Sequence, residues 1–210
     1  MAESAVGAFL FDVDGVLIAT ADAHGRVWRA WARLRGLDPE EVWEATQGRR
    51  RTDILRLLAP QLDPAGEHLV LDRLMAAEEP GFRAFDGAAA LLRSLPPHLW
   101  AVVTSSRAHP TAARLARTGL PVPGVRICAE DVSEGKPSPE GYLTAAARLA
   151  VDPARCVVVE AGLAAGCTVY AVASTHRPAE LARAHVCFPS LSEAGRALTA
   201  VHRSRLDDGC

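Results

Sequence analysis

The stretch Phe11-Asp12-Val13-Asp14-Gly15-Val16-Leu17 follows an apolar run directly and contains two aspartates one residue apart, followed by a glycine. In open α/β sheets, ligands bind at the carboxyl ends of strands, and both carboxylates follow such an end. A turn begun by Gly15 can bring both side chains to one site. We therefore expect a shared functional site here.

Two buried carboxylates without a cation are costly, so this site is expected to hold a metal. Mg²⁺ prefers hard oxygen ligands and usually bridges to phosphate. A calcium loop would place glycine at its sixth position and glutamate at its twelfth. Here Gly15 is fourth and Ala23 is twelfth, which disfavours calcium. The remaining alternative is that the aspartates only cap a helix.

Six short apolar runs, most of them separated by helical patterns, predict buried parallel strands crossed by helices. The runs are Ala5–Phe11, Leu99–Thr104, Val125–Ala129, Cys156–Val159, Thr168–Ala173 and His185–Phe188. The predicted helices between and after them include Gly87–Ser94, Thr111–Arg117, Glu140–Leu149 and Leu191–Val201. The pattern indicates an α/β fold with a Rossmann-like parallel-sheet core.

The segment 20–83 breaks this alternation, because it contains several helical patterns and no convincing strand. Val27, Trp28, Trp31 and Leu34 form one apolar stripe at helical spacing. Asp38-Pro39 is typical of a helix start, with aspartate as N-cap and proline at the first position. We therefore predict an inserted all-helical cap domain at 20–83 and a core domain made of 1–19 and 84–210.

Composition excludes several classes of partner. The chain has 210 residues, 49% of them hydrophobic, and a formal charge of −2, with a pI of about 6.4. This balance favours neither nucleic acid nor an anionic membrane as partner. No apolar run approaches the roughly 20 residues that span a bilayer, and the N-terminus lacks a basic secretory signature. We expect a cytoplasmic protein; its oligomeric state is not indicated.

The five cysteines are dispersed and contain no C-x-x-C pair, which is typical of reduced thiols in the cytosol. Three of them lie in apolar runs, and we interpret these three as core residues. They are Cys128, Cys156 and Cys187.

Four segments, in order, resemble the motifs of the haloacid dehalogenase superfamily. These are Phe11–Leu17, Val102–Ser106, Gly135–Pro139 and Cys156–Glu160. The resemblance runs from about Gly7 to Val172. It is closest to phosphatases with a small helical cap, such as bacterial sugar phosphatases and glycerol-phosphate phosphatases. The dehalogenases themselves usually lack the second aspartate, so Asp14 favours the phosphatase branch.

The resemblance implies a role for each motif residue, and each role is chemically reasonable. Asp12 would attack phosphorus to form an aspartyl-phosphate, and Asp14 would act as general acid and base. Mg²⁺ would be held by Asp12 and the main-chain carbonyl of Asp14. The hydroxyl of Thr104, the turn at Ser105 and the charge of Lys136 would bind phosphate.

The predicted cap contributes Gly48-Arg49-Arg50-Arg51. Related capped enzymes place a basic residue just after a glycine in this region, facing the substrate. We therefore predict that Arg49 and Arg51 contact substrate. For Arg50 we favour a solvated helix start. His24 lies near a position that faces the cap hinge in similar enzymes.

One departure from the family pattern concerns the metal. The fourth strand typically ends in two adjacent acidic residues, whereas here Glu160 is followed by Ala161. Roughly seven or eight residues look absent before the glycine-rich turn, by comparison with loops of usual length. Either the protein lacks this second acidic ligand, or the sequence is interrupted between Glu160 and Ala161. Glu160 remains the predicted third metal ligand beside Asp12 and Asp14.

These patterns together predict a Mg²⁺-dependent phosphomonoester hydrolase that acts on a small phosphorylated metabolite, in particular a sugar or polyol phosphate. Two alternatives remain open. A phosphomutase similar to β-phosphoglucomutase would share every motif and differ in cap closure and water exclusion. A catalytically silent protein that binds phosphorylated ligands is the other, and Ala161 motivates it.

Overall fold

The computed structural model describes residues 6–46, 49–160, 168–172 and 184–198. Its strands are β1 (Ala8–Phe11), β2 (Trp100–Val103), β3 (Arg126–Ile127), β4 (Cys156–Glu160), β5 (Thr168–Val172) and β6 (Val186–Phe188). All pair in parallel in the order β3-β2-β1-β4-β5-β6. Each predicted apolar run contains one strand, so the predicted parallel sheet is confirmed. The strand order reverses beside β1, which is where open α/β sheets bind ligands.

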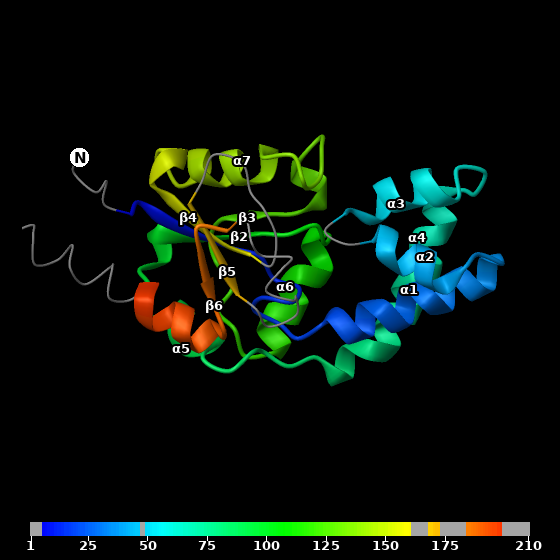
Figure 1. Ribbon diagram of the computed structural model, residues 1–210, viewed down its shortest axis with the longest axis horizontal. Coiled ribbons are helices and arrows are strands. Elements are labelled where there is room, and N and C mark those ends of the chain that lie inside the picture. Colours follow the sequence, from blue (N-terminus) through cyan, green and yellow to red (C-terminus); the bar gives the residue numbers. More distant parts are fainter. Residues whose placement is uncertain (1–5, 47–48, 161–167, 173–183, 199–210) are drawn as a thin grey trace, which may run out of the picture.

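Helices cover both faces of this sheet (Figure 1). The core helices are α5 (Ala88–Ser94), α6 (Ala108–Arg117) and α7 (Glu140–Arg148), and residues 191–198 are also helical. Short 3-10 turns occur at η2 (Pro97–Leu99), η3 (Ala129–Asp131) and η4 (Pro153–Arg155). The helix predicted from Thr111 begins three residues earlier, because Pro110 lies in its first turn, where its missing N–H costs nothing.

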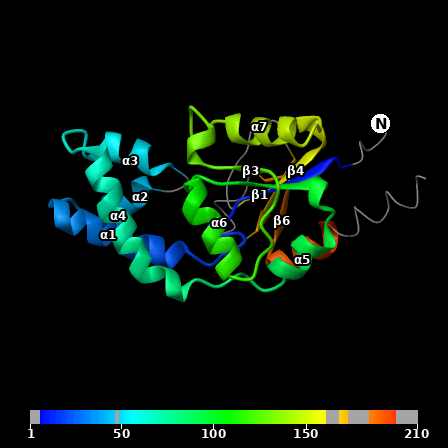
Figure 2. The same cartoon turned by 180° about the vertical axis from the view of Figure 1, so that it is seen from behind.

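Alternating residues of β1 supply the two halves of the core. Ala8 and Leu10 pack in the cluster that contains Tyr142 of α7. Phe9 and Phe11 pack in a second cluster on the other side, and this cluster includes residues of α5, α6 and 191–198. The ribbon seen from behind shows α7 on one side of the sheet and α5 and α6 on the other (Figure 2). The sheet is thus buried on both faces, as its nearly continuous apolar strands require.

Four helices lie together beside the carboxyl end of the sheet and form the cap (Figure 1). They are α1 (Ala21–Arg35), α2 (Pro39–Ala45), α3 (Arg51–Leu58) and α4 (Pro64–Glu78), followed by the short turn η1 (Glu79–Gly81). Asp38 caps α2 by accepting hydrogen bonds from the N–H groups of Glu40 and Glu41, as predicted. No strand occurs among the described residues of this region.

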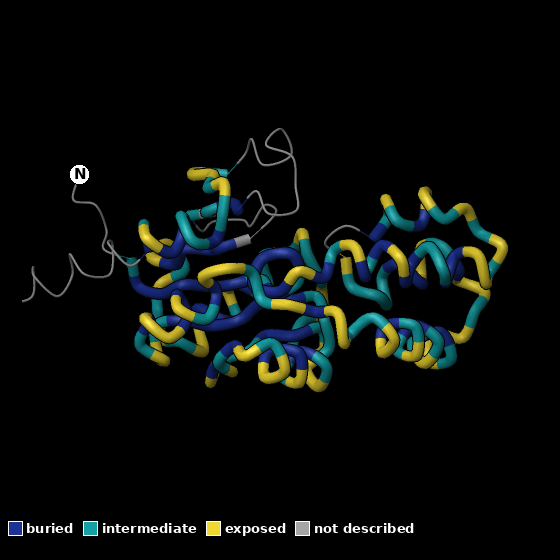
Figure 3. Tube along the Cα trace, turned by 90° about the horizontal axis from the view of Figure 1, so that it is seen from below, coloured by how far each residue is buried: buried dark blue, intermediate teal, exposed yellow. Residues whose placement is uncertain are grey.

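The cap has its own buried centre, visible as dark segments on the inward sides of its helices (Figure 3). Trp28 and Trp31 meet edge to face, with ring centroids 5.5 Å apart. The carboxylate of Glu67 accepts hydrogen bonds from the Trp31 indole at 2.6 Å and from Arg35 at 2.9 Å. The predicted stripe is wrong at Leu34, which is 59% exposed. Arg35 binds the buried Glu67 instead.

The chain crosses between core and cap twice, and the two crossings run side by side. Ala19 donates its N–H to the Arg83 carbonyl at 2.9 Å, and Phe85 donates to the Leu17 carbonyl at 3.0 Å. The predicted domain boundaries, at 19/20 and 83/84, fall at this paired crossing.

Cys128 and Cys156 are buried, as expected, but Cys187 is exposed. It lies on β6, the last strand of the sheet, whose residues are largely exposed. An apolar run on an edge strand therefore gave the wrong expectation for this thiol. Within the described part of the chain, no helix is both long and apolar enough to cross a bilayer.

Candidate active site

Asp12 lies at the strand-order reversal, immediately after β1. Its N–H donates to the Val159 carbonyl of β4 at 3.0 Å, which extends the sheet by one step. A tight turn follows: Gly15 has a positive φ of 80°, and its N–H donates to the Ile18 carbonyl at 2.9 Å. Glycine adopts this left-handed conformation without strain. The predicted turn is present, and Asp12 and Asp14 line one cavity.

The Asp12 carboxylate pairs with the cation predicted to bind phosphate. Lys136 Nζ lies 2.8 Å from Asp12 Oδ2, and both side chains are largely buried. The other oxygen, Oδ1, accepts the Val13 N–H at 2.7 Å. Lys136 follows β3 by nine residues and reaches back from the loop before α7. The two motifs, more than 120 residues apart, therefore form one charged pair.

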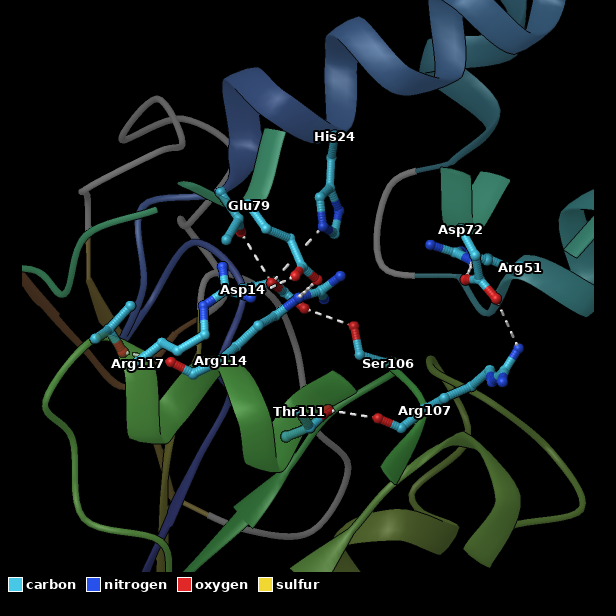
Figure 4. A network of polar contacts seen from close by, with 12 residues as sticks. Asp14, His24, Arg51, Asp72, Glu79, Ser106, Arg107, Thr111, Arg114 and Arg117 are labelled. Carbon is cyan, nitrogen blue, oxygen red and sulfur yellow. Dashed lines mark hydrogen bonds and ion pairs between the residues drawn. The ribbon is translucent and has the colours of Figure 1, made fainter. Parts of the chain in front are cut away.

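Asp14 is held by three side chains from different elements. Its Oδ1 accepts a hydrogen bond from Thr20 Oγ1 at 2.9 Å, and its Oδ2 accepts one from Ser106 Oγ at 2.7 Å. His24 Nε2 lies 3.7 Å from Oδ1. The close view shows His24, Ser106 and Arg114 converging on this carboxylate (Figure 4). Asp14 is thus held by Thr20, where the chain enters the cap, by His24 of α1 and by Ser106 of the loop after β2.

Burial raises the pKa of the Asp14 carboxyl, but its neighbours lower it by more. The lowering comes from His24, from the positive charge of Arg114, and from the hydroxyls of Ser106 and Thr20. The net pKa lies below that of an ordinary aspartate. Burial also lowers the pKa of His24, and Arg114 and Arg51 add to this effect against the attraction of Asp14. The pKa values of both members of this pair therefore lie below their ordinary values.

Thr104 and Ser105 form the turn after β2. The Thr104 N–H continues the sheet to the Ile127 carbonyl at 2.9 Å, and its hydroxyl accepts the Ser106 N–H at 3.1 Å. Both Thr104 and Ser105 line the same cavity as the aspartates. Thr104 is 6% exposed. The predicted phosphate-binding residues are therefore gathered around Asp12.

A cavity of about 870 Å³ extends from these residues into the cap. This volume is toward the upper end of the roughly 300–1,000 Å³ typical of small-molecule sites. Its core side is lined by Asp12, Asp14, Thr104, Ser105, Arg107 and Lys136, and its cap side by Trp28, Trp43, Arg49, Arg51, His68 and Asp72. The cavity joins a strongly polar floor to a cap wall with two tryptophans.

The two cap arginines expected to contact substrate both line this cavity, but they differ in burial and in their partners. Arg51 Nη1 lies 2.5 Å from Asp72 Oδ1, and Asp72 Oδ2 lies 3.3 Å from Arg107 Nη1 of the core. Burial lowers the pKa of Arg51, and Asp72 opposes this effect. Arg49 is exposed and donates to the Ala45 carbonyl at 3.1 Å. Arg51 is therefore fixed by its partner, whereas Arg49 projects from a more exposed position.

Glu160 is the last residue of β4 and pairs with Ala171 of β5. Its side chain, and the junction with Ala161 that the sequence singled out, lie outside the described residues. Within the described ranges, no three His, Cys, Asp or Glu side chains gather as a metal site. A Mg²⁺ site needs fewer protein ligands than this, because Mg²⁺ commonly binds one or two protein oxygens together with phosphate and water. Asp12 and the Asp14 carbonyl fit that smaller set.

Five residues at or beside this site escaped the sequence interpretation. Ser106 and Thr20 bind Asp14, and only the hydroxyl-rich run after β2 hinted at Ser106. Arg114 is 4% exposed and its Nε donates to Glu79 at 3.1 Å; Arg117 binds the same carboxylate at 2.7 Å (Figure 4). Arg50, interpreted as solvated, instead donates hydrogen bonds to the Val132 and Ser133 carbonyls of the core. No sequence signal pairs residues so far apart.

Known proteins resemble this chain over most of its length. The model of the family described as haloacid dehalogenase-like hydrolase matches residues 6–168. Hexitol phosphatase A of Escherichia coli is 42% identical over 176 residues, covering 78% of this chain and 82% of that protein. Glycerol-1-phosphate phosphohydrolase 2 of Saccharomyces cerevisiae is 34% identical and covers 81% of this chain and 76% of its own.

Solved structures share the fold. A hydrolase of the same family from Deinococcus radiodurans, with bound phosphate and sodium, has a TM-score of 0.68 at 30% identity. It covers 95% of this chain and 98% of its own. The family match, the relatives and the fold agree with the clustered aspartates, lysine and threonine. The chain belongs to the haloacid dehalogenase-like hydrolases.

Proposed function

We propose that this protein is a Mg²⁺-dependent phosphomonoesterase that hydrolyses a sugar or polyol phosphate through an aspartyl-phosphate on Asp12. The observation that carries the proposal is the pairing of Asp12 with Lys136 at 2.8 Å, next to an Asp14 held by two hydroxyls. A nucleophile, a cation and a fixed proton carrier are the groups that stepwise phosphoryl transfer requires.

In the first step, a carboxylate oxygen of Asp12 attacks phosphorus and the bond to the leaving oxygen breaks. The leaving alkoxide takes a proton from Asp14, which must therefore be protonated when substrate is bound. Asp14 is ionised in the state described here, and the negative charge of an arriving phosphate favours its protonation. Lys136 and the turn at Thr104 and Ser105 would hold the phosphoryl oxygens.

In the second step, water attacks the phosphorus of the aspartyl-phosphate and gives its proton to Asp14. The bond between phosphorus and the Asp12 oxygen breaks, so phosphate leaves and the carboxylate is restored. Thr20 and Ser106 keep Asp14 in one orientation through both steps. Mg²⁺, held by Asp12 and the Asp14 carbonyl, would supply charge neutralisation at the phosphate.

The cap wall favours a substrate with several hydroxyl groups. Arg51, Asp72, Thr52 and His68 offer polar groups to the cavity, and the flanking tryptophans offer apolar surface. The relatives named as hexitol and glycerol-1-phosphate enzymes support the same class. We place Arg49 and Arg51 as substrate contacts on this basis.

The test is phosphate release from a panel of hexitol, hexose, glycerol and nucleotide phosphates, with Mg²⁺ and with EDTA. Mg²⁺-dependent release that is fastest with a polyol or sugar phosphate is expected. A product isomer that keeps its phosphate would identify a phosphomutase. No turnover of any ester, combined with tight binding of a sugar phosphate, would identify a silent binder and overturn the proposal.

A further inference from the structure

The side chain of Arg50 leaves the cap and binds the core. Its Nη1 donates to the Val132 carbonyl and its Nη2 to the Ser133 carbonyl, both at 2.9 Å. Its Nε donates to Asp53 Oδ2 at 2.7 Å, which fixes the guanidinium from the cap side. Only 13% of the side chain is exposed. A fork of this kind is a strong, directional contact.

Gly135 provides the space in which Arg50 lies. A Cβ at this position would stand 2.6 Å from Arg50 Nε, 2.7 Å from Cγ and 2.8 Å from Cδ. Its backbone is not in the left-handed region, because the glycines with positive φ are other ones. Glycine is therefore required here by the close approach of the arginine and not by the turn itself.

The opposite side of the same loop is held by the core. Glu140, the first residue of α7, accepts hydrogen bonds from the Ser133 N–H at 2.8 Å and the Glu134 N–H at 2.7 Å. The loop 132–135 is thus held from two sides. The Glu140 carboxylate of the core accepts hydrogen bonds from its amides, and the Arg50 guanidinium of the cap donates hydrogen bonds to its carbonyls. Lys136 is the next residue, and its Nζ lies 2.8 Å from Asp12.

We infer that Arg50 is a positioning residue that makes the placement of Lys136 depend on the docked cap. Lys136 directly follows the loop that Arg50 holds, so this loop fixes the main-chain position from which Nζ reaches Asp12. With the cap docked, Arg50 fixes the loop and Lys136 faces the nucleophile. When the cap moves away, the carbonyls of Val132 and Ser133 lose this partner. The inference rests on the proposed function, and it gives Arg50 a role different from those of Arg49 and Arg51.

The role predicts a kinetic signature. Every phosphate ester uses Lys136, so loss of Arg50 should lower kcat for large and small substrates alike. A substrate-binding arginine would instead raise KM for the sugar phosphate and spare a small ester. Gly135→Ala should act in the same way as Arg50→Ala, because its methyl group displaces the arginine.

The experiment measures kcat and KM for Arg50→Ala, Gly135→Ala and the double variant. The substrates are a hexitol phosphate and p-nitrophenyl phosphate. Each single variant should lose about tenfold or more in kcat on both, the equivalent of one charge-assisted hydrogen bond. The double variant should be no worse than Arg50→Ala, because alanine lacks the Cγ, Cδ and Nε atoms that the new methyl group would otherwise meet. Arg26→Ala is the control, since Arg26 pairs with Glu78 within the cap region; it should keep wild-type kcat.

Two results would overturn the inference. One is a change confined to KM for the hexitol phosphate. The other is an additive loss in the double variant, which would show that the two residues act separately. If Arg50→Ala fails to fold, Arg50→Met replaces it, because methionine keeps the apolar stem and removes the guanidinium; the same loss of kcat on both substrates is expected. Turnover by the wild type tests the proposed function independently of all these variants.

Discussion

Ser106 Oγ, on the loop after β2, donates a 2.7 Å hydrogen bond to Oδ2 of Asp14, on the loop after β1. The two residues are 92 positions apart, and the parallel pairing of β1 with β2 brings their loops together. Thr20 occupies the other oxygen of the same carboxylate. Asp14, the proposed proton carrier, is therefore held by Ser106 of the core on one side and by Thr20, where the chain enters the cap, on the other.

Asp12→Asn should abolish turnover and leave the fold intact, because it removes a nucleophile and no packing contact. Loss on the order of 10³-fold or more in kcat is expected for removal of a group that forms the covalent bond. Steady-state kinetics and far-UV circular dichroism check the two halves of this prediction. Substantial activity in this variant would exclude Asp12 as nucleophile.

Arg51→Ala should impair the true substrate far more than p-nitrophenyl phosphate. Arg51 is largely buried against Asp72 in the cavity wall, and loss of one charge-assisted contact costs about 1.5–3 kcal/mol. Arg49→Ala should act in the same direction with a smaller effect, because Arg49 is exposed. The measurement is kcat/KM for both substrates. Equal losses on the two substrates would place these arginines in the phosphate site or in folding, against the cap assignment.

Glu67→Gln should destabilise the cap, because this carboxylate joins Trp31 and Arg35 in a buried position. A hydrogen bond to a charged group contributes about 1.5–3 kcal/mol, which a urea titration resolves. Glu78→Gln, on the exposed pair with Arg26, is the matched control and should have a smaller effect. Equal effects would mean that burial adds nothing to the Glu67 contact.

The same contact predicts a pH dependence. The hydrogen bonds from Arg35 hold the pKa of Glu67 below its usual value, and the Trp31 bond assists them against burial. A lowered folded-state pKa gives stabilisation that is fully present above the ordinary value of about 4.3 and is lost as pH falls. Wild-type stability should therefore drop more steeply than that of Glu67→Gln between neutral pH and acid. Equal loss of stability with falling pH in the wild type and in Glu67→Gln would contradict a lowered pKa of Glu67.

Mg²⁺ affinity tests the junction at Glu160 and Ala161. In the sequence Ala161 directly follows Glu160, so one acidic residue is left at the end of β4. A high Mg²⁺ concentration should therefore be needed for half-maximal activity. A Mg²⁺ titration checks this prediction, and half-maximal activity at a low Mg²⁺ concentration would contradict it.

The strands and the clustering of Asp12, Thr104 and Lys136 were predictable, because periodicity and motif position are local features. The partners that tune the site were not. Arg114 and Glu79, or Arg50 and Gly135, meet only after the cap has packed beside the sheet. The predictions that Cys187 and Leu34 are buried were wrong for a related reason. Apolar character in the sequence does not tell which residues of an edge strand or a helix face inward. Long-range packing supplies that information.

Trapping the covalent intermediate tests the central claim most directly. Asp14→Asn cannot efficiently deprotonate the attacking water, so phosphate should accumulate on Asp12 when the substrate is p-nitrophenyl phosphate, whose leaving group needs little protonation. Acid quench followed by peptide mass spectrometry should find one added phosphoryl group on the peptide containing Asp12, and none in Asp12→Asn. A phosphoryl group on another residue, or wild-type turnover with no phosphorylated peptide under any quench time, would contradict catalysis through Asp12.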